Sequence, residues 1–419
     1  MFHRRSRRTE VTFSAVTAVA LVGATVAGCS SASGGSSAQG SAAPGVDVTN
    51  HTITIGTTGP QTGPLAAAYE STYGAIARLA ASNDTVNGWK IKYVQLDDQY
   101  DPATALSNAQ QLIQQDHVFA IVAQGGSPTN AAVLPYAVAS KTLDIGPVTE
   151  SGVVLAKYAS APNVFPFEVP YAQLAAYDLK YVHANVSGSY ALAYQAGSAG
   201  GPALAGWNYE AQQLGAKPAA TVSTSATATD FSGYAGSLKA SNAGTVLTWM
   251  APNQLAALMQ ASSAIGYKPK WVADWPDLSS SFLKLAGSNG QGMLFGDWVP
   301  PTVNPSGGVT KVMNSIKATT PDKQPSVTAL LGWVGMSVFL EGLERATAGG
   351  KTPTVSSLTT ALRNCQPFDA GGIGLQLKYC GAKLSAQQDS MYTWDGSGLK
   401  VISGPAAVPD VPTANLEGQ

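Results

Sequence analysis

Charged residues are the scarcest part of this sequence. Only 12% of its 419 residues are charged and the net charge is −1, whereas globular proteins typically carry ~25% charged residues. Arginine is scarcer still, because only three arginines follow Arg8, namely Arg78, Arg345 and Arg363. Nucleic-acid binding needs a basic patch, and clustered arginines are one way to bind polyphosphates or sulfates. We therefore expect no nucleic-acid partner and no site built on arginine.

Groups that would support catalysis are also sparse. The sequence contains neither a Gly-x-Ser-x-Gly nucleophile elbow nor a His-Glu-x-x-His zinc motif. Its four histidines are scattered, at His3, His51, His117 and His183. The acidic pair Asp97-Asp98 resembles part of a metal site, but we interpret it as a structural turn between a strand and a helix. We expect no enzyme activity, no metal and no cofactor.

The N-terminus has the layout of an export signal. Residues 1–8 are basic, residues 11–26 are apolar, and small residues lead to Cys29. The apolar stretch is shorter than the ~20 residues of a membrane span, and Val26-Ala27-Gly28-Cys29 resembles the bacterial lipobox. We expect residues 1–29 to be a lipoprotein signal peptide with Cys29 lipidated as the first mature residue, so that the protein is exported and lipid-anchored to the outer face of the cytoplasmic membrane. An ordinary signal peptide with an incidental cysteine is the alternative.

Cysteine is scarce as well, and export determines how it is used. With Cys29 lipidated, only Cys365 and Cys380 remain. Extracytoplasmic compartments favour disulfides, and no histidine lies near either residue to complete a zinc site. We predict a Cys365–Cys380 disulfide, which would contribute ~3 kcal/mol in the chain-entropy model.

What the sequence does contain is a regular alternation of strand and helix patterns. Residues 53–57 and 89–96 read as strands, while residues 65–81 and 102 to about 115 read as helices. A second alternating series runs from residue 190 to about residue 295. This spacing predicts parallel, doubly wound sheets in an α/β fold.

Extended segments separate these series. Residues 163–170 and 297–305 contain prolines that favour extended backbone, and both suit crossovers between two lobes. A long apolar helix is predicted over 327–346, the chain crosses back at 366–374, and a hairpin of residues 391–394 and 399–402 ends the fold.

Residues 118–152 form the central unit of the chain. An apolar run ends in Gln124-Gly125-Gly126-Ser127, a helix opens at Ser127-Pro128, and a second apolar run ends at Pro147. In an open α/β sheet this unit binds ligands at the carboxyl edge of the strands. Glycine lets the backbone approach a ligand, and a helix start presents free N–H groups. Ser127 is either a ligand contact or a plain N-cap, and one residue can serve as both.

These residues resemble a known family, the leucine/isoleucine/valine-binding family of ABC-importer binding proteins. The resemblance covers residues 53–403 and rests on the following motifs: Ile55-Gly56, Gly59-Pro60-Gln61-Thr62-Gly63-Pro64, Asn87-Gly88, Leu96–Pro102, Gln111-Leu112, Thr229-Asp230-Phe231, Ile265-Gly266-Tyr267 and Phe368-Asp369 with Gly371-Gly372. It implies two doubly wound, Rossmann-like lobes joined by a three-strand hinge, with a small-molecule ligand caught in the cleft between them. It also implies delivery of that ligand to an ABC permease with its ATPase.

The resemblance further implies where the ligand binds. Family members hold a ligand carboxylate with hydroxyl and backbone N–H groups after the third and fourth strands. Here those positions are Gln124, Gly126, Ser127, Val148 and Thr149.

The chain also departs from the family pattern. Glu150 lies nearest to a family hydroxyl, and Ala199-Gly200 stands where a Tyr-Gly step is common. The family's acid for a ligand amino group falls near Trp275, beside Asp274 and Asp277. Glu150 and Asp274 are either ligand contacts or solvated loop carboxylates.

Aromatic residues at predicted element ends are the remaining candidates. Tyr69, Trp249 and Trp275 fall where side chains would face the cleft, although a tryptophan is more often part of a core. If two of them line the cleft, the ligand has an apolar or aromatic part.

The expected organisation is a signal peptide (1–29), a flexible tether (30–49), lobe 1 (50–168 and 300–366), lobe 2 (169–299 and 367–405) and a loose tail (406–419). The expected function is capture of an amino acid, or a related amide or carboxylate, for an ABC importer by a monomer. A ligand-sensing receptor subunit of the same fold, partnered with a membrane signalling protein, is the alternative.

Overall fold

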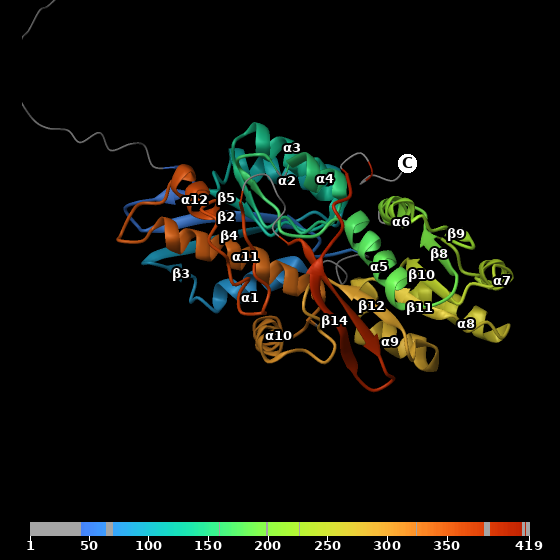
Figure 1. Ribbon diagram of the computed structural model, residues 1–419. Coiled ribbons are helices and arrows are strands. Elements are labelled where there is room, and N and C mark those ends of the chain that lie inside the picture. Colours follow the sequence, from blue (N-terminus) through green and yellow to red (C-terminus); the bar gives the residue numbers. More distant parts are fainter. Residues whose placement is uncertain are drawn as a thin grey trace, which may run out of the picture. The chain divides into compact units, whose positions relative to one another are not determined.

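The computed structural model describes residues 43–63, 70–158, 160–197, 200–225, 227–323, 325–380, 386–412 and 415 (Figure 1). The predicted signal peptide and Cys29 lie outside this part of the chain, as do Tyr69 and Ala199. Trp275 is described in its backbone only.

The first sheet is mostly parallel and carries two short antiparallel strands. Its strand order is β3-β4-β2-β5-β6-β7, with β1 paired antiparallel to β2 and β3 antiparallel to β4. The strands are β1 (Val46–Asp47), β2 (Thr52–Gly59), β3 (Thr85–Val86), β4 (Trp89–Asp97), β5 (Ala120–Val122), β6 (Leu143–Ile145) and β7 (Val164–Phe165). The helices that belong with it are α1 (Ser71–Ala80), α2 (Pro102–Gln114), α3 (Ser127–Ala139), α4 (Gly152–Tyr158), α10 (Gly307–Thr319), α11 (Val327–Ala346) and α12 (Val355–Leu362).

The second sheet repeats this plan. Its order is β14-β13-β12-β11-β10-β8-β9, parallel from β9 to β12 and antiparallel beyond. The strands are β8 (Tyr190–Gln195), β9 (Thr221–Thr224), β10 (Thr245–Trp249), β11 (Lys270–Ala273), β12 (Leu294–Asp297), β13 (Gln388–Trp394) and β14 (Leu399–Ala407). The helices are α5 (Tyr171–Asn185), α6 (Gly200–Leu214), α7 (Ser232–Ala240), α8 (Pro252–Ala264) and α9 (Ser280–Ala286), with short 3₁₀ turns at Trp275–Asp277 and Gly287–Gly290.

The chain passes between the two sheets three times. It leaves the first sheet after β7, returns after β12 to form α10, α11 and α12, and crosses again after α12 to form β13. The predicted doubly wound α/β fold is thus confirmed, including the three crossovers between the sheets.

Local sequence explains why several of these elements form. β5, β6 and β10 are buried along their whole length, as expected for parallel strands covered on both faces. The Asp101 side chain caps α2 by accepting from the Thr104 N–H, and Pro102 follows at the first helical position.

Helix α11 is the central helix of the first lobe. It is the one helix in the described ranges that is long and apolar enough to cross a membrane, but it is mostly buried within the protein. It packs on α1 through glycine, because a methyl group at Gly332 would overlap the Ser71 carbonyl and one at Gly74 would overlap Ala329. Gly335 packs against Gly146 in the same way, so α11 lies against the sheet as predicted.

Three boundaries differ from the sequence prediction. The predicted tether contains β1, whose Val46 pairs with Ile53. Strand β14 continues to Ala407 rather than ending at residue 402. Pro405 does not end it, because β14 is an edge strand and its outer side needs no ladder N–H. Val411, in the predicted loose tail, is buried.

One long helix was not predicted at all. Helix α5 covers Tyr171–Asn185 and follows Pro170, at the end of a proline-containing crossover. Its residues are buried on most sides, including Gln173 and Asp178. The sequence therefore has no clear polar face to mark a helical period.

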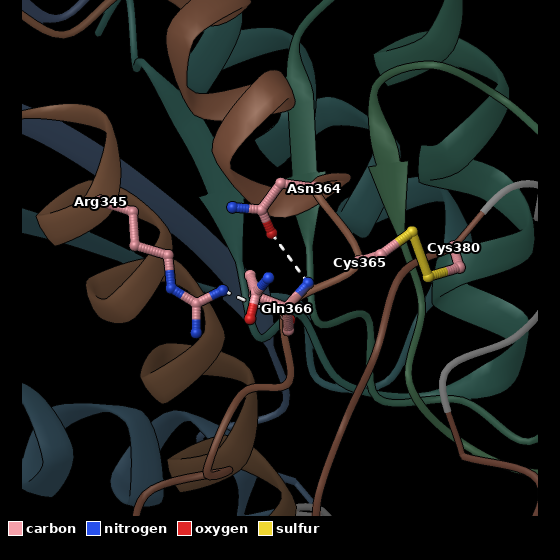
Figure 2. Close-up of a disulfide and its surroundings, with 5 residues drawn as sticks. All are labelled: Arg345, Asn364, Cys365, Gln366 and Cys380. Carbon is pink, nitrogen blue, oxygen red and sulfur yellow. Dashed lines mark hydrogen bonds between the residues drawn. A yellow bond between two sulfur atoms is a disulfide. The ribbon is translucent and has the colours of Figure 1, made fainter.

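The predicted disulfide between Cys365 and Cys380 is present, with 4.9 Å between the Cα atoms. Figure 2 shows the bond beside the segment that leaves α12, where the Gln366 N–H donates to the Asn364 side chain at 3.0 Å. Arg345 on α11 donates to the carbonyls of Gln366 and Pro367 at 3.4 and 2.6 Å. The crossover is therefore fastened to α11 as well as by the disulfide.

Candidate functional site

The strand order of each sheet points to one edge for a ligand. In each sheet the chain first adds a parallel strand on one side of a central strand (β4 beside β2, β9 beside β8) and then adds the next on the other side (β5, β10). The order in which strands are added therefore reverses at β2 and at β8. Ligands of such sheets bind beyond the carboxyl ends of the strands at this switch point. In the first sheet the switch point lies between Gly59 and the Gln124–Ser127 turn. In the second it lies between Gln195 and Ala251, whose N–H donates to the Gln195 side chain at 3.2 Å.

The turn between β5 and α3 depends on its two glycines. Gly126 has φ of 105°, and a methyl group there would lie 2.6 Å from the Tyr100 ring. A methyl group at Gly125 would lie 2.5 Å from Ser71 Oγ. Only glycine combines this conformation with this close packing, so the pair fixes the backbone where α3 begins.

Most polar groups of this turn are used inside the lobe. The Gly126 N–H donates to the Val148 carbonyl at 3.0 Å, and the Val148 N–H donates to the Gln124 carbonyl at 2.8 Å. The buried Gln124 side chain donates to Asp144 at 2.7 Å. Gln124, Gly126 and Val148 therefore join two turns to each other, whereas the sequence prediction gave their N–H or side-chain groups to a ligand.

The start of α3 keeps donors for a ligand. Its N-cap is Gly126, so no side chain caps the helix. Within the described part of the chain, the N–H groups of Ser127 and Thr129 meet no acceptor. Pro128 lies between them and has no N–H. Two outward N–H groups and the helix dipole favour an anion at this point.

A chain of hydrogen bonds also directs a hydroxyl proton outward. The Ser151 N–H donates to Thr149 Oγ1 at 3.2 Å, and the Thr149 hydroxyl donates to Ser127 Oγ at 3.0 Å. The Ser127 oxygen is thus an acceptor in the chain, which leaves its own proton for another partner. Ser127 is only partly buried, so the network ends in an accessible donor.

Sequence reasoning missed two hydroxyls at the start of α1. The predicted helix over 65–81 placed Ser71 and Thr72 in its interior, but α1 begins at Ser71. Both side chains are buried, and neither hydroxyl has a partner among the described residues. Ser71 Oγ lies beside Gly125 and Thr72 Oγ1 beside Gly59. The one available signal was the Glu70-Ser71-Thr72 step inside an alanine-rich stretch.

Two buried carboxylates lie next to this network. Glu150 accepts from Trp298 Nε1 at 2.9 Å, and its carbonyl accepts from the Tyr171 N–H at 3.2 Å. Burial raises the pKa of Glu168 well above its usual value, the charge of Glu150 raises it further, and a hydrogen bond from the Thr149 backbone opposes the shift. Glu150 is therefore buried between segments of both sheets rather than solvated. Glu168 was not among the predicted site residues.

The second sheet contributes aromatic and acidic groups. Trp249, at the end of β10, is 3% exposed and packs edge-on against Tyr171 and Trp207 at 5.7 and 6.2 Å between centroids. Burial raises the pKa of Asp274 to about 7, and Asp274 hydrogen-bonds Asp277. Both predicted residues thus lie in a buried environment, Trp249 among aromatic rings and Asp274 beside another carboxyl.

Among the residues that the structure describes, no group of three His, Cys, Asp or Glu side chains has the arrangement of a metal site. The chemistry available at the first switch point is hydrogen-bond donation to an anion, beside carboxylates.

Two doubly wound sheets, three crossovers and polar groups at both switch points define a bilobal ligand-binding protein. The chain belongs to the periplasmic binding protein family, whose family model matches residues 52–391. No curated protein matches the sequence significantly.

Solved structures share the fold at low sequence identity. A fatty acid ABC transporter substrate-binding protein from Thermomonospora curvata is 20% identical with a TM-score of 0.71, over 87% of this chain and 94% of that one. A solute binding protein of an ABC transporter from Rhodopseudomonas palustris HaA2, in complex with p-hydroxybenzoic acid, is 18% identical with a TM-score of 0.71, over 86% and 98%. The branched-chain amino acid transporter substrate binding protein LivJ from Streptococcus pneumoniae, in complex with isoleucine, is 18% identical with a TM-score of 0.68, over 84% and 99%.

Proposed function

We propose that this protein is the extracytoplasmic substrate-binding component of an ABC importer. It captures a small organic carboxylate, such as an amino acid or a related compound, and delivers it to a membrane permease without chemical change. Family membership and ABC-transporter neighbours that bind isoleucine or p-hydroxybenzoic acid support this class of ligand.

The observation that carries the proposal is the donor set at the start of α3. The Ser127 hydroxyl and the N–H groups of Ser127 and Thr129 converge at the switch point of the first sheet. These groups match a carboxylate, because each donates and none carries a charge that would need neutralising in the empty site. Thr149 positions Ser127, while Gln124, Gly126 and Val148 fix the backbone around it.

Binding is proposed to close two lobes on the ligand. Lobe 1 would comprise residues 50–168 and 300–366, and lobe 2 residues 169–299 and 367–405. Trp249, Trp275, Tyr69 and Asp274 would contribute from around the cleft. The ligand favours the closed form only through its extra contacts there, and the closed monomer then docks on the permease.

The proposed anchor is a lipid on Cys29, followed by a tether. Labelled palmitate is expected in the wild-type chain and not in Cys29→Ser when the protein is expressed in bacteria. Equal labelling of both chains would reject the anchor while leaving the binding function untouched.

A thermal-shift screen against amino acids, amides and aromatic and aliphatic acids tests the binding function. A ligand at a hundred times its Kd stabilises the folded state by ~2.7 kcal/mol. Ser127→Ala should weaken the best ligand at least about tenfold, since it removes a charge-assisted hydrogen bond. Ser140→Ala, at the other end of α3, is the matched control. No shift with any carboxylate would reject the proposal.

A further inference from the structure

A cavity of about 200 Å³ lies among the segments through which the chain passes between the two sheets. Residues 297–300, which leave β12, form one wall, residues 374–376, between α12 and β13, form a second, and side chains of β13 and β14 complete it. The cavity has room for about six groups of the size of a water molecule. None of its lining residues is a predicted ligand contact, so this cavity is separate from the site at the start of α3.

The one carboxyl in the lining belongs to Asp297, which is 3% exposed. Its Oδ1 accepts a hydrogen bond from the Val299 N–H at 3.1 Å. Within the described part of the chain, its other carboxyl oxygen accepts no hydrogen bond. A buried polar atom is costly without a partner, so this oxygen favours an occupant of the cavity that can donate to it.

The charges around Asp297 have one sign. Burial raises the pKa of Asp297 well above its usual value, and three neighbouring acids raise it further, namely Asp389, Glu150 and Asp274. The phenol of Tyr392, whose pKa burial raises to about 12, also interacts with Asp297. None of the described groups that shift the pKa of Asp297 is a cation. The cavity therefore attracts a positive ion and repels an anion.

The rest of the lining distinguishes an organic cation from a metal ion. It includes two aromatic rings and three apolar side chains, namely Trp298, Tyr392, Pro300, Leu375 and Pro405. Aromatic rings attract cations over their faces, and apolar side chains favour a hydrocarbon body. A metal ion instead needs several oxygen or nitrogen ligands, and no suitable group of three acidic, histidine or cysteine side chains occurs in the described ranges. A small organic ammonium ion fits this combination.

Trp298 connects the cavity to the site at the start of α3. It lines the cavity, and its Nε1 donates to the Glu150 carboxylate at 2.9 Å. Glu150 follows Thr149, whose hydroxyl donates to Ser127 Oγ at 3.0 Å. Glu150 also acts electrostatically on Asp297, and that effect is mutual. A positive charge beside Asp297 would therefore offset the negative charge of Glu150 and favour an anion at the start of α3.

From this geometry we propose that the cavity is a second binding site, for a small organic ammonium ion, and that its occupation strengthens ligand capture. The ammonium group donates to the unpartnered oxygen of Asp297, and the hydrocarbon part packs on the apolar walls. The second site is independent of the proposed function, whereas its coupling to ligand capture rests on that function.

Piperidinium and tetrahydropyran are the probes that test the second site. They are rings of the same size, of which only piperidinium is charged and donates hydrogen bonds. Calorimetry at pH 8, where the Asp297 carboxyl competes least with its own proton, should show that piperidinium binds at least about tenfold more tightly. Equal affinities, or no binding of piperidinium, would overturn the proposal.

Two variants tie the binding to this cavity. Asp297→Asn keeps an acceptor for the Val299 N–H and removes the charge, so piperidinium affinity should fall at least about tenfold. Gln388→Trp, at an exposed position of β13 that lines the cavity, fills the space and should weaken piperidinium similarly. Asp178→Asn is the control, because Asp178 is a buried acid on α5 that does not line the cavity. Unchanged affinity in a folded Asp297→Asn or Gln388→Trp protein, or the same loss in Asp178→Asn, would contradict the proposal.

The coupling has its own measurement. Saturating piperidinium should tighten the tightest-binding carboxylate of the thermal-shift screen at least about threefold, and that carboxylate should tighten piperidinium by the same factor, because coupling is reciprocal. Trp298→Phe removes the hydrogen bond to Glu150 and should reduce this factor. An unchanged or weakened carboxylate affinity would overturn the coupling. Asp297-dependent binding of piperidinium in a protein that no carboxylate stabilises would reject the proposed function and keep the second site.

Discussion

Gly126 is the residue on which the geometry of the donor set depends most. Its φ of 105° disfavours any side chain, and a methyl group would also lie 2.6 Å from the Tyr100 ring and 2.7 Å from Thr129 Oγ1. Gly126→Ala should therefore cost about 2–4 kcal/mol in urea unfolding, from backbone strain plus overpacking.

Gly188 provides the matched control for that substitution. It has φ of 101°, but a methyl group there would meet nothing within 4 Å. Gly188→Ala measures the strain alone, so the difference between the variants reports the close packing at the turn. Equal losses would show that the Tyr100 and Thr129 contacts adjust freely, and ligand affinity should fall only in Gly126→Ala.

The residues of the site differ in how visible they are from sequence. The Gly125-Gly126-Ser127 turn was predictable because glycine and a helix-starting Ser-Pro are local signals. Ser71 was not, since it depends on where α1 begins. Glu168 was not either, because its contact with Thr149 depends on how the segment that contains α4 and β7 folds back. Local chemistry thus reveals the glycine turn with Ser127, and the fold is needed to reveal Ser71 and Glu168.

At the scale of elements, the contact of α1 with α11 supports the start of α1. A methyl group at Gly332 would overlap the Ser71 carbonyl, so Gly332→Ala must push the two helices apart. We expect a loss of about 1–3 kcal/mol in unfolding free energy and weaker ligand binding, because Ser71 packs on Gly125.

An open position on another helix controls for helix propensity. Gly236 lies inside α7, where a methyl group would meet nothing within 4 Å. Gly236→Ala should stabilise the protein by up to ~1 kcal/mol, since alanine favours helix over glycine. A similar gain in Gly332→Ala would mean that α1 and α11 separate without cost.

The disulfide should affect stability more than ligand binding. Replacing Cys365 and Cys380 by serine removes a covalent link across 15 residues, for which a loss of about 2–4 kcal/mol is typical. The crossover keeps its other attachments, including the hydrogen bond from Trp333 Nε1 to the Gly371 carbonyl at 3.0 Å. The melting temperature should fall while the Kd changes less than about threefold. Loss of binding in the folded double variant would assign the disulfide a role in the cleft.

Helices and strands were predictable from sequence where a start residue or an apolar run marks them locally. Asp101-Pro102 marks the start of α2, and the long apolar run that begins at Val327 predicts α11 with the bounds that the structure has, 327–346. Helix α5 was missed because it is buried on most sides, and β1 because a two-residue strand exists only through its pairing with β2.

At the scale of the whole molecule, buried acids should make stability depend on pH in an unusual direction. Five aspartates that interact with one another are buried on α5, β12 and β13 and in the turn after β11, namely Asp178, Asp274, Asp277, Asp297 and Asp389. The buried Glu150 also faces this group, as do the phenols of Tyr177 and Tyr392. Burial raises the pKa of Asp274 to about 7 and that of Asp389 to about 8.

The sign of the effect follows from linkage. An unfolded aspartate releases its proton near pH 4, whereas these folded aspartates keep theirs to about pH 7 or 8. Between those values the unfolded chain binds fewer protons, so the unfolding free energy falls as pH rises from about 4 to about 8. Urea midpoints should therefore be higher at pH 5.5 than at pH 8. Asp389→Asn should flatten this slope and stabilise the protein at pH 8, whereas Asp322→Asn, at an exposed position, should leave the slope unchanged. A midpoint that rises with pH in the wild-type chain would show that these carboxyls are ionised in the folded protein and that an unrecognised cation compensates them.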